Sequence, residues 1–389
     1  MKKVISMLLT LTLLLSFAAT FAVQTGAEEA AETAKAPVFY GFQLTAPADN
    51  KQNIRFVSVL TSLEGDAVGY KITADYLKGG KSWTKTVNYK QETAQVYASL
   101  LANNAYGAEA VTATALAAEL KLSEGKGLLA LVIENVPTNI GEITFTVETY
   151  VKNGDKTVTS DESYFIVENG VKSSKKVLFR EDYNDYTGST IPGMKNLMTD
   201  QSKAPECEVK QDTENGGKYL APCGWRAFKI LDGACLNDAT HYTIEFDALN
   251  NNGVIQVMFN TNFQTSNLVG KQFSEVTGVS MTRLDVRGKA NAMWSQLGQV
   301  NGWILDQDTK ASCDTNCATA HHYAIDLDKS GDKVIVTVYV DGVKVMQTDK
   351  VSKGTYNDIY LIGQGEGTVT ATFDNLKVTA GAYLTQKAS

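Results

Sequence analysis

The second half of the chain closes with Val369-Thr-Ala-Thr-Phe373-Asp374-Asn375-Leu376-Lys377-Val378. It opens with Val177-Leu-Phe179-Arg-Glu181-Asp182-Tyr183, followed by Gly188-Ser-Thr-Ile-Pro192-Gly193. Strand-like runs and turns lie between these two ends, with hardly any helical periodicity. This pattern predicts an all-β domain.

One hairpin in this half carries a strong short-range signal. Asp341-Gly342 separates two alternating runs, and Asp-Gly is a preferred pair for a tight hairpin turn. In the first run, Val334–Val340, the valines should point to one face and Ile335, Thr337 and Tyr339 to the other. Further strands are expected at Tyr242–Ala248, Val254–Phe259, Tyr323–Leu327, Val343–Gln347 and Tyr356–Gly363.

The opening and closing segments together resemble those of the concanavalin A-like jelly roll, the fold of many lectins, laminin-G-like domains and glucanases. The resemblance covers about half of the chain, from Val177 to Tyr383, and its motifs are structural. It implies a concave sheet face of the kind that often holds sugar. It does not say whether such a domain cuts sugar, binds it or does neither.

The first half, residues 36–168, is predicted to be an antiparallel β-sandwich, because short alternating runs are separated by Gly and Asn turns. An Ala- and Leu-rich stretch, Thr93–Leu120, interrupts it as a short helical insertion. A small β module of secreted Gram-positive proteins is similar to this half, on Tyr40-Gly41, Ile54-Arg-Phe-Val-Ser58, Val68-Gly-Tyr70, Asn135-Val-Pro137 and Phe145-Thr-Val147. The polar segment 169–176 is expected to be a flexible linker, and residues 177–383 the jelly-roll domain.

The N-terminus predicts export from a bacterial cell. Lys2 and Lys3 precede an apolar run, Val4–Phe17, and small residues follow it, as in a signal peptide occupying residues 1–27. Cleavage is expected after Ala22 or Ala27. The apolar run is short for a transmembrane helix. We therefore expect a mature protein without a membrane span, secreted and either extracellular or associated with the cell surface.

The charge balance argues against nucleic acid as a partner. Without Lys2 and Lys3, 34 basic residues face 43 acidic ones, a formal charge of −9 if cleavage follows Ala22. Binding to phosphate backbones needs a basic surface. The roughly 360 mature residues also exceed one compact domain, which is consistent with two.

All five cysteines lie in the second half, at Cys207, Cys223, Cys235, Cys313 and Cys317. In an exported protein they are disulfide candidates, with one thiol left over and the pairing open. Cys313-x3-Cys317-x3-His321-His322 also has ligand types at a roughly zinc-like spacing, but the segment has the composition of a loop. We favour a disulfide or free thiols here over a metal site.

Two acidic residues could belong to a glycosidase. Jelly-roll glucanases carry carboxylates at alternating strand positions, because two of them must flank one glycosidic bond. Glu245 and Asp247 match the first two positions and would lie about 7 Å apart on one strand face. Leu249 or Asn250 stands where the third acid belongs. The sequence therefore favours a solvated strand face over a catalytic pair.

Calcium is left open. Asp326-Leu-Asp328-Lys-Ser330-Gly331-Asp332 resembles the start of an EF-hand loop, but Thr337 stands where that loop needs a bidentate acid. A hairpin turn between two strands explains the segment better. No cofactor is expected.

The candidate ligand-binding residues are aromatic, because a Trp face stacks on the apolar face of a sugar ring. Trp225, Trp294 and Trp303 lie in polar stretches of the second half, with Arg226 beside the first. Trp83, on an expected hairpin of the first half, is a weaker candidate.

Nucleophile, phosphate-loop, zinc-protease and dinucleotide motifs are absent from the sequence. We therefore expect a secreted, non-catalytic carbohydrate-binding protein whose jelly-roll domain holds a polysaccharide or other glycan. The alternatives are a glycoside hydrolase of the concanavalin A-like kind, using Glu245 and Asp247, and a cell-surface adhesion or scaffold protein without a sugar ligand.

Overall fold

The computed structural model describes residues 34–60, 65–78, 80–92, 128–186, 208–213, 217–221, 226–231, 236, 239–250, 253–261, 280–289, 292–301, 304–305, 310–313, 320–351, 358–364 and 371–384. The described residues are almost entirely strands and turns, which confirms the all-β prediction. Residues 35–389 form one compact unit. No helix in the described part of the chain has the length and apolar content of a membrane span. The expected signal peptide and the helical insertion, Thr93–Leu120, lie outside the described residues.

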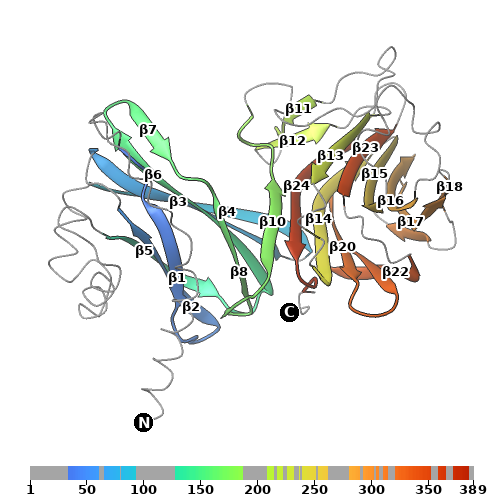
Figure 1. The fold of residues 1–389 in the computed structure, drawn as a ribbon, viewed down its shortest axis with the longest axis horizontal. Helices are drawn as coiled ribbons and strands as arrows, with labels where there is room; N and C mark the ends of the chain where they lie inside the picture. The colour runs from blue at the N-terminus through green and yellow to red at the C-terminus, as the bar shows by residue number, and fades with distance from the viewer. Residues whose placement is uncertain are drawn as a thin grey trace, which may run out of the picture. The chain divides into compact units, whose positions relative to one another are not determined.

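The first half contains two antiparallel sheets (Figure 1). Sheet A has the order β1-β2-β5, and sheet B has the order β4-β3-β6-β8-β9 with β7 also paired to β6. The strands are β1 (Val38–Leu44), β2 (Lys51–Val59), β3 (Ala67–Lys78), β4 (Lys81–Glu92), β5 (Leu128–Pro137), β6 (Glu142–Asn153), β7 (Lys156–Thr159), β8 (Ser163–Glu168) and β9 (Val171–Lys172). Phe56 of sheet A packs against Tyr70 and Phe145 of sheet B, so the two sheets enclose an aromatic core.

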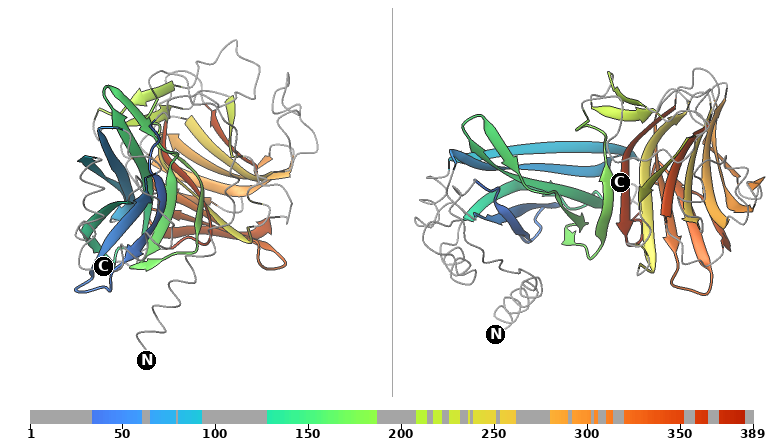
Figure 2. Two further views of the ribbon diagram at one scale, coloured as in Figure 1. Left: turned by 60° about the vertical axis from the view of Figure 1, so that its left-hand side comes forward. Right: turned by 45° about the horizontal axis from the view of Figure 1, so that its top comes forward.

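The second half also forms two sheets, seen as layers in Figure 2. Sheet C has the order β11-β12-β24-β14-β20-β21-β22, with β10 also paired to β24. Its strands are β10 (Lys176–Glu181), β11 (Glu208–Gln211), β12 (Lys218–Ala221), β14 (His241–Asn250), β20 (His321–Asp328), β21 (Val334–Val340), β22 (Val343–Val351) and β24 (Ala371–Ala380).

Sheet D has the order β13-β23-β15-β16-β17-β18, with β19 also paired to β17. Its strands are β13 (Arg226–Leu231), β15 (Gly253–Thr261), β16 (Ser280–Lys289), β17 (Ala292–Asn301), β18 (Ile304–Leu305), β19 (Lys310–Cys313) and β23 (Asp358–Gln364).

The two ends of the second half pair with each other. β10 runs antiparallel to β24, from Lys176 opposite Ala380 to Glu181 opposite Leu376. The Asp341-Gly342 hairpin is also present: both residues have positive φ, 50° and 77°, and Val340 pairs with Val343.

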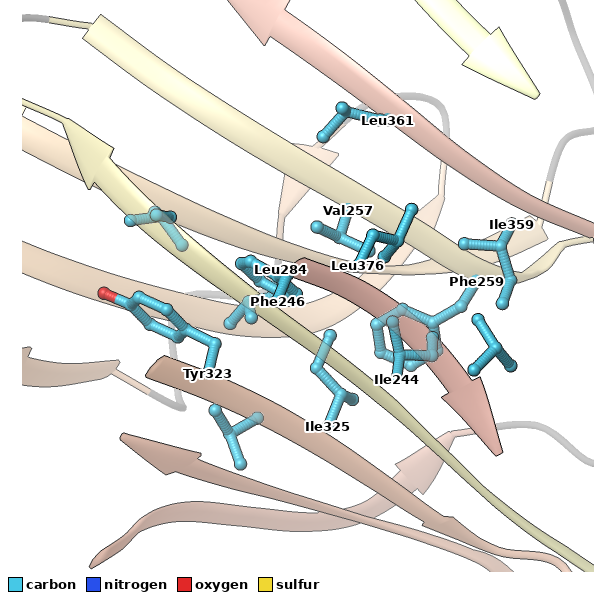
Figure 3. Close-up of a cluster of buried hydrophobic side chains, with 14 of the residues drawn as sticks. Ile244, Phe246, Val257, Phe259, Leu284, Tyr323, Ile325, Ile359, Leu361 and Leu376 are labelled. Atoms are coloured by element: carbon cyan, nitrogen blue, oxygen red, sulfur yellow. The ribbon is translucent and has the colours of Figure 1, made fainter. Parts of the chain in front are cut away.

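The core between sheets C and D follows the expected alternation. Ile244 and Phe246 of β14 and Ile325 of β20 meet Val257 and Leu284 of sheet D (Figure 3). All are fully buried, and each such side chain contributes about 1.5–3 kcal/mol to folding. Because side chains alternate along a strand, the residues between them belong to the opposite, non-core faces of the two sheets.

Part of the segment expected to be a flexible linker is held in place. Lys175 forms ion pairs with Glu142 of β6 and Glu168 of β8, at 2.8 and 2.6 Å. Its side chain is only 11 % exposed. The division into two independently folding domains, 36–168 and 177–383, stays a prediction.

Candidate functional site

The non-core face of sheet C carries a cluster of buried ionisable side chains. Glu245 on β14, His322 on β20 and Lys377 on β24 lie on neighbouring strands, and Glu142 of β6 reaches them from the first half of the chain. Glu245 and His322 are each 6 % exposed. The expectation of a solvated strand face is therefore wrong for Glu245, because β3, β4 and β6 cover this part of the sheet.

Lys377 lies between two carboxylates. Its Nζ is 2.9 Å from Glu142 Oε1 and 2.8 Å from Glu245 Oε2, and it donates a third bond to Thr144 Oγ1 at 3.0 Å. All three ammonium protons therefore have an acceptor. Burial alone would lower the pKa of Lys377, but the two carboxylates outweigh burial and raise it above its usual value.

His322 connects the two acids of β14. Its Nδ1 is 2.8 Å from Asp247 Oδ1, and its Nε2 lies 3.5 Å from Glu245 Oε1. The second contact is an ion pair without hydrogen-bond geometry, since Nε2 is buried and has no hydrogen-bond partner. Burial opposes the charged imidazolium, but Asp247 and Glu245 outweigh it and raise the pKa of His322 to about 9.

Glu245 and Asp247 both interact with the basic side chains of the cluster. Burial would raise the pKa of Glu245, but Lys377 and His322 lower it to about 2, so its carboxylate is ionised at neutral pH. Asp247 accepts further hydrogen bonds from Ser82 Oγ at 2.9 Å and Asn375 Nδ2 at 2.7 Å.

One more carboxyl group of this face lies beside Asp247. Asp374 of β24 is the register partner of Asp247 on β14. Burial raises the pKa of Asp374 to about 8, against the effect of the Asn375 backbone N–H and with the help of the Asp247 charge. Asp374 is therefore mostly protonated at neutral pH.

A pocket of about 60 Å³ opens beside this cluster. Asp75, Ser82 and Trp83 line it from the β3–β4 hairpin, and Tyr383 lines it from the end of the described chain. Arg180 of β10 closes another side, with Nε 2.9 Å from Asp75 Oδ2.

The structure also places the other sequence candidates. Trp294 lies in β17, where its backbone is opposite Arg287 of β16, and Arg226 opens β13. Trp225 and Trp303 lie outside the described residues, as do Cys207, Cys223, Cys235 and Cys317. Cys313 is the last residue of β19. The disulfides therefore stay predictions.

The two segments weighed for metal are part of the sheet. His321 Nδ1 lies 2.7 Å from Asp341 Oδ2, and His322 belongs to the cluster above. Within the described residues no group of His, Cys, Asp and Glu has the arrangement of a metal site. In the calcium-like segment, Asp328 accepts a bond from the Ser330 backbone N–H at 2.9 Å within the turn between β20 and β21. The predicted hairpin turn is present.

Sequence reasoning missed His322, Lys377, Glu142 and Asn375 as members of this cluster. One signal was available: Asn375 and Lys377 alternate with the core residues Leu376 and Val378 on the strand that was predicted to end the fold. A polar position between core positions marks the non-core face. No local sequence pattern indicated that the first half of the chain covers that face.

Comparisons with known proteins give only distant likenesses. No family model matches the chain, and no curated protein matches it. A sialidase is 12 % identical with a TM-score of 0.33, over 63 % of this chain, which spans 21 % of that protein. Domain 4 of AbnA, an extracellular GH43 arabinanase from Geobacillus stearothermophilus solved with arabinotriose, is 11 % identical with a TM-score of 0.33, over 54 % of this chain and 95 % of that domain.

An endo-1,3-beta-glucanase from Streptomyces sioyaensis is 12 % identical with a TM-score of 0.31, over 54 % of this chain and 97 % of its own. Likenesses at this level establish neither a shared fold nor a shared activity.

Proposed function

We propose that this chain is an exported, non-catalytic carbohydrate-binding protein. Its second half is a concanavalin A-like domain, and the glycan lies on the non-core face of sheet D. One observation carries the proposal: the strand register of sheet D brings glutamine, aspartate, arginine and tryptophan residues to neighbouring positions of this face.

Three described residues mark that face. Gln256 is 6 % exposed, and Met258 and Tyr360 are fully buried. They alternate with the core residues Ile255, Val257, Ile359 and Leu361, and none of the three belongs to the core cluster.

The strand register extends this row across sheet D. Gln256 lies opposite Asp285 of β16, and Asp285 lies opposite Gln296 of β17. Two pairs further along the ladder, Arg287 lies opposite Trp294. Residue types with amide, carboxylate, guanidinium and indole groups are those that bind sugar hydroxyls and the apolar face of the ring.

The state of Glu245 and Asp247 argues against this pair as the two carboxylates of a glycosidase. A glycosidase needs one carboxylic acid with a raised pKa and a second carboxylate free to act on the sugar. Glu245 has the opposite shift, to about 2, and its side chain is 8 % exposed. Asp247 already accepts bonds from Ser82, His322 and Asn375.

A scaffold without a sugar ligand is the second candidate, and the contacts between the two halves favour it. Arg180 pairs with Asp75 at 2.7 Å, and Lys377 pairs with Glu142 at 2.9 Å. Both ion pairs join a strand of the second sandwich to a strand of the first. Such contacts would hold the two sandwiches together, as a rigid spacer requires.

Retention of the exported chain, beginning at Glu28, on a panel of insoluble polysaccharides tests the proposal. We expect retention of at least one polymer without release of reducing ends. Trp294→Ala should weaken it by about 1–3 kcal/mol, and Val343→Ala, which removes an exposed apolar side chain of β22, should leave it unchanged.

Two outcomes would overturn the binding function. Retention on none of the polymers would favour the scaffold. Reducing ends released by the wild-type chain, and not by Glu245→Gln, would favour the enzyme, provided that urea unfolding shows the variant to be folded.

A further inference from the structure

We propose that the pocket between the β3–β4 hairpin and the non-core face of sheet C is a second ligand site, which takes the terminal residue of a glycan or another neutral polyhydroxyl group. This site is separate from the face of sheet D. It rests on the pocket, on two buried polar atoms of its wall that have no hydrogen bond, on the balance of charges around it and on an exposed tryptophan.

The pocket itself is small. Its volume of about 60 Å³ accommodates about four water-sized groups. This is too little for a whole sugar ring and enough for its hydroxymethyl or diol edge. The site therefore fits the end of a chain, with the remainder of the sugar outside.

Two buried polar atoms on the pocket wall have no hydrogen-bond partner within the protein. They are His322 Nε2 and Tyr383 Oη, and both residues line the pocket. The raised pKa of His322 makes its Nε2 a donor at neutral pH, while a phenol can donate or accept. Because a buried polar group left unpaired is unfavourable, an oxygen that reaches both atoms gains two hydrogen bonds.

The charges around the pocket favour an uncharged ligand. Three carboxylates, those of Asp75, Glu142 and Glu245, line it together with three cations, which are Arg180, Lys377 and protonated His322. Each cation already has a carboxylate partner. An anion would have to compete with these partners, whereas a hydroxyl group can donate to one wall and accept from the other.

Trp83 supplies an apolar surface next to the pocket. It is 49 % exposed although it is the largest side chain of the pocket wall, and Lys78 Nζ lies 5.0 Å from the centre of its ring. Ser82 and Thr84, on either side of it in β4, also line the pocket. A half-exposed indole beside buried hydroxyl and imidazole groups gives a sugar ring a stacking surface while its edge enters the pocket.

The test is a titration of the exported chain with methyl α-D-glucopyranoside, methyl β-D-galactopyranoside and N-acetylglucosamine up to 50 mM. Saturation-transfer NMR and tryptophan fluorescence report binding. We expect at least one of the three to bind in the millimolar range. Trp83→Ala should weaken it about tenfold, and Tyr383→Phe, which removes only the unpaired hydroxyl, should weaken it about threefold to tenfold.

Val343→Ala is the control, because Val343 of β22 is an exposed apolar side chain that does not line the pocket, and its loss should leave the dissociation constant unchanged. Tyr383→Phe should unfold at the same urea concentration as the wild type, since its hydroxyl has no partner to lose. Failure of all three saccharides to bind, or binding that neither Trp83→Ala nor Tyr383→Phe weakens, would overturn the second site. Polymer retention that depends on Trp294 would stand in either case, so the two proposals fail separately.

Discussion

The non-core faces of sheets C and D both carry polar side chains between apolar core positions, and they differ in what meets those side chains. On sheet C, Glu245 and Asp247 find a lysine, a histidine and an asparagine of neighbouring strands, and β4 and β6 of the first sandwich complete the set. On sheet D, Gln256 lies in a register row that leads to Asp285 and Gln296.

The difference shows that a pair of acids at alternating strand positions does not define a catalytic site. Its meaning depends on what covers the strand, and here the cover comes from residues more than a hundred positions earlier in the chain. We therefore expect charge changes on sheet C to alter folding, and changes on sheet D to alter binding.

The largest effect is expected for Lys377→Met. This substitution leaves Glu142 and Glu245 buried without their shared cation, and breaking a buried ion pair in this way costs about 3–5 kcal/mol. Urea unfolding measures the change in the free energy of unfolding. Lys333→Met is the control, because Lys333 and Asp349 are 68 % and 56 % exposed and their ion pair should contribute about 0.5 kcal/mol. Equal losses in the two variants would contradict the structural role of sheet C.

A pH dependence is expected next in size. Because the pKa of His322 is raised to about 9 in the folded protein, its contribution is fully present below pH 6.5 and is lost as the pH rises to 9. The loss should reach at most about 3 kcal/mol. The pKa of Asp374 is also raised, to about 8, so its contribution to the stability of the fold likewise falls as the pH rises to 8.

Urea midpoints at pH 6, 7.5 and 9 measure this slope. His322→Gln should flatten this slope, and Asp374→Asn should remove the part of it that ends near pH 8.

On the acid side, the lowered pKa of Glu245 stabilises the fold above pH 4.5, and this contribution disappears as the pH falls to about 2. A wild-type midpoint that is constant from pH 6 to 9 would show that the cluster does not carry these charges.

Gly80→Ala tests whether the β3–β4 hairpin reaches sheet C. Gly80 has a φ of +77°, and a Cβ there would lie 2.3 Å from the backbone oxygen of Asp341. Gly154 also has a positive φ, +58°, but nothing lies within 4 Å of its Cβ position. The free energy of unfolding should fall by about 1–2 kcal/mol in both alanine variants, because alanine is strained in the left-handed region. In Gly80→Ala it should fall by about 1–3 kcal/mol more, because the new Cβ clashes with Asp341. Equal unfolding free energies would place the hairpin away from Asp341.

The smallest effect on stability is expected for Gln256→Ala on sheet D. Loss of the buried amide should cost about 1 kcal/mol of folding free energy. Polymer retention should fall about threefold to tenfold, if this amide contacts the glycan. A variant that loses stability and keeps full retention would remove Gln256 from the proposed binding face.

Much of the fold was predictable where the signal is local. The Asp341-Gly342 turn, the alternation of Val334–Val340 and the polar turn after Asp328 are each encoded within a few residues, and the structure has them. The pairing of β10 with β24 was not predicted, since nothing local joins segments so far apart.

The cluster on sheet C was not predictable in the same way. The partners of Glu245 come from β6, β20 and β24, and their meeting depends on register and on the packing of the two sandwiches. Periodicity showed that Glu245 and Asp247 leave the core, but it could not show what lies on the other side of the sheet. The candidate tryptophans Trp225 and Trp303 lie outside the described residues and stay predictions.

The close approach of Gly80 to Asp341 restricts the insertions that the β3–β4 hairpin can accept. Hairpin tips are usually where a protein family gains and loses residues, because a tip that projects into water can lengthen freely. Here the β3–β4 tip ends against the backbone of another hairpin, whose Asp341 also holds His321. Insertions at this tip should therefore be rare among descendants of this chain, while the β6–β7 tip at Gly154, with open space around it, should vary in length.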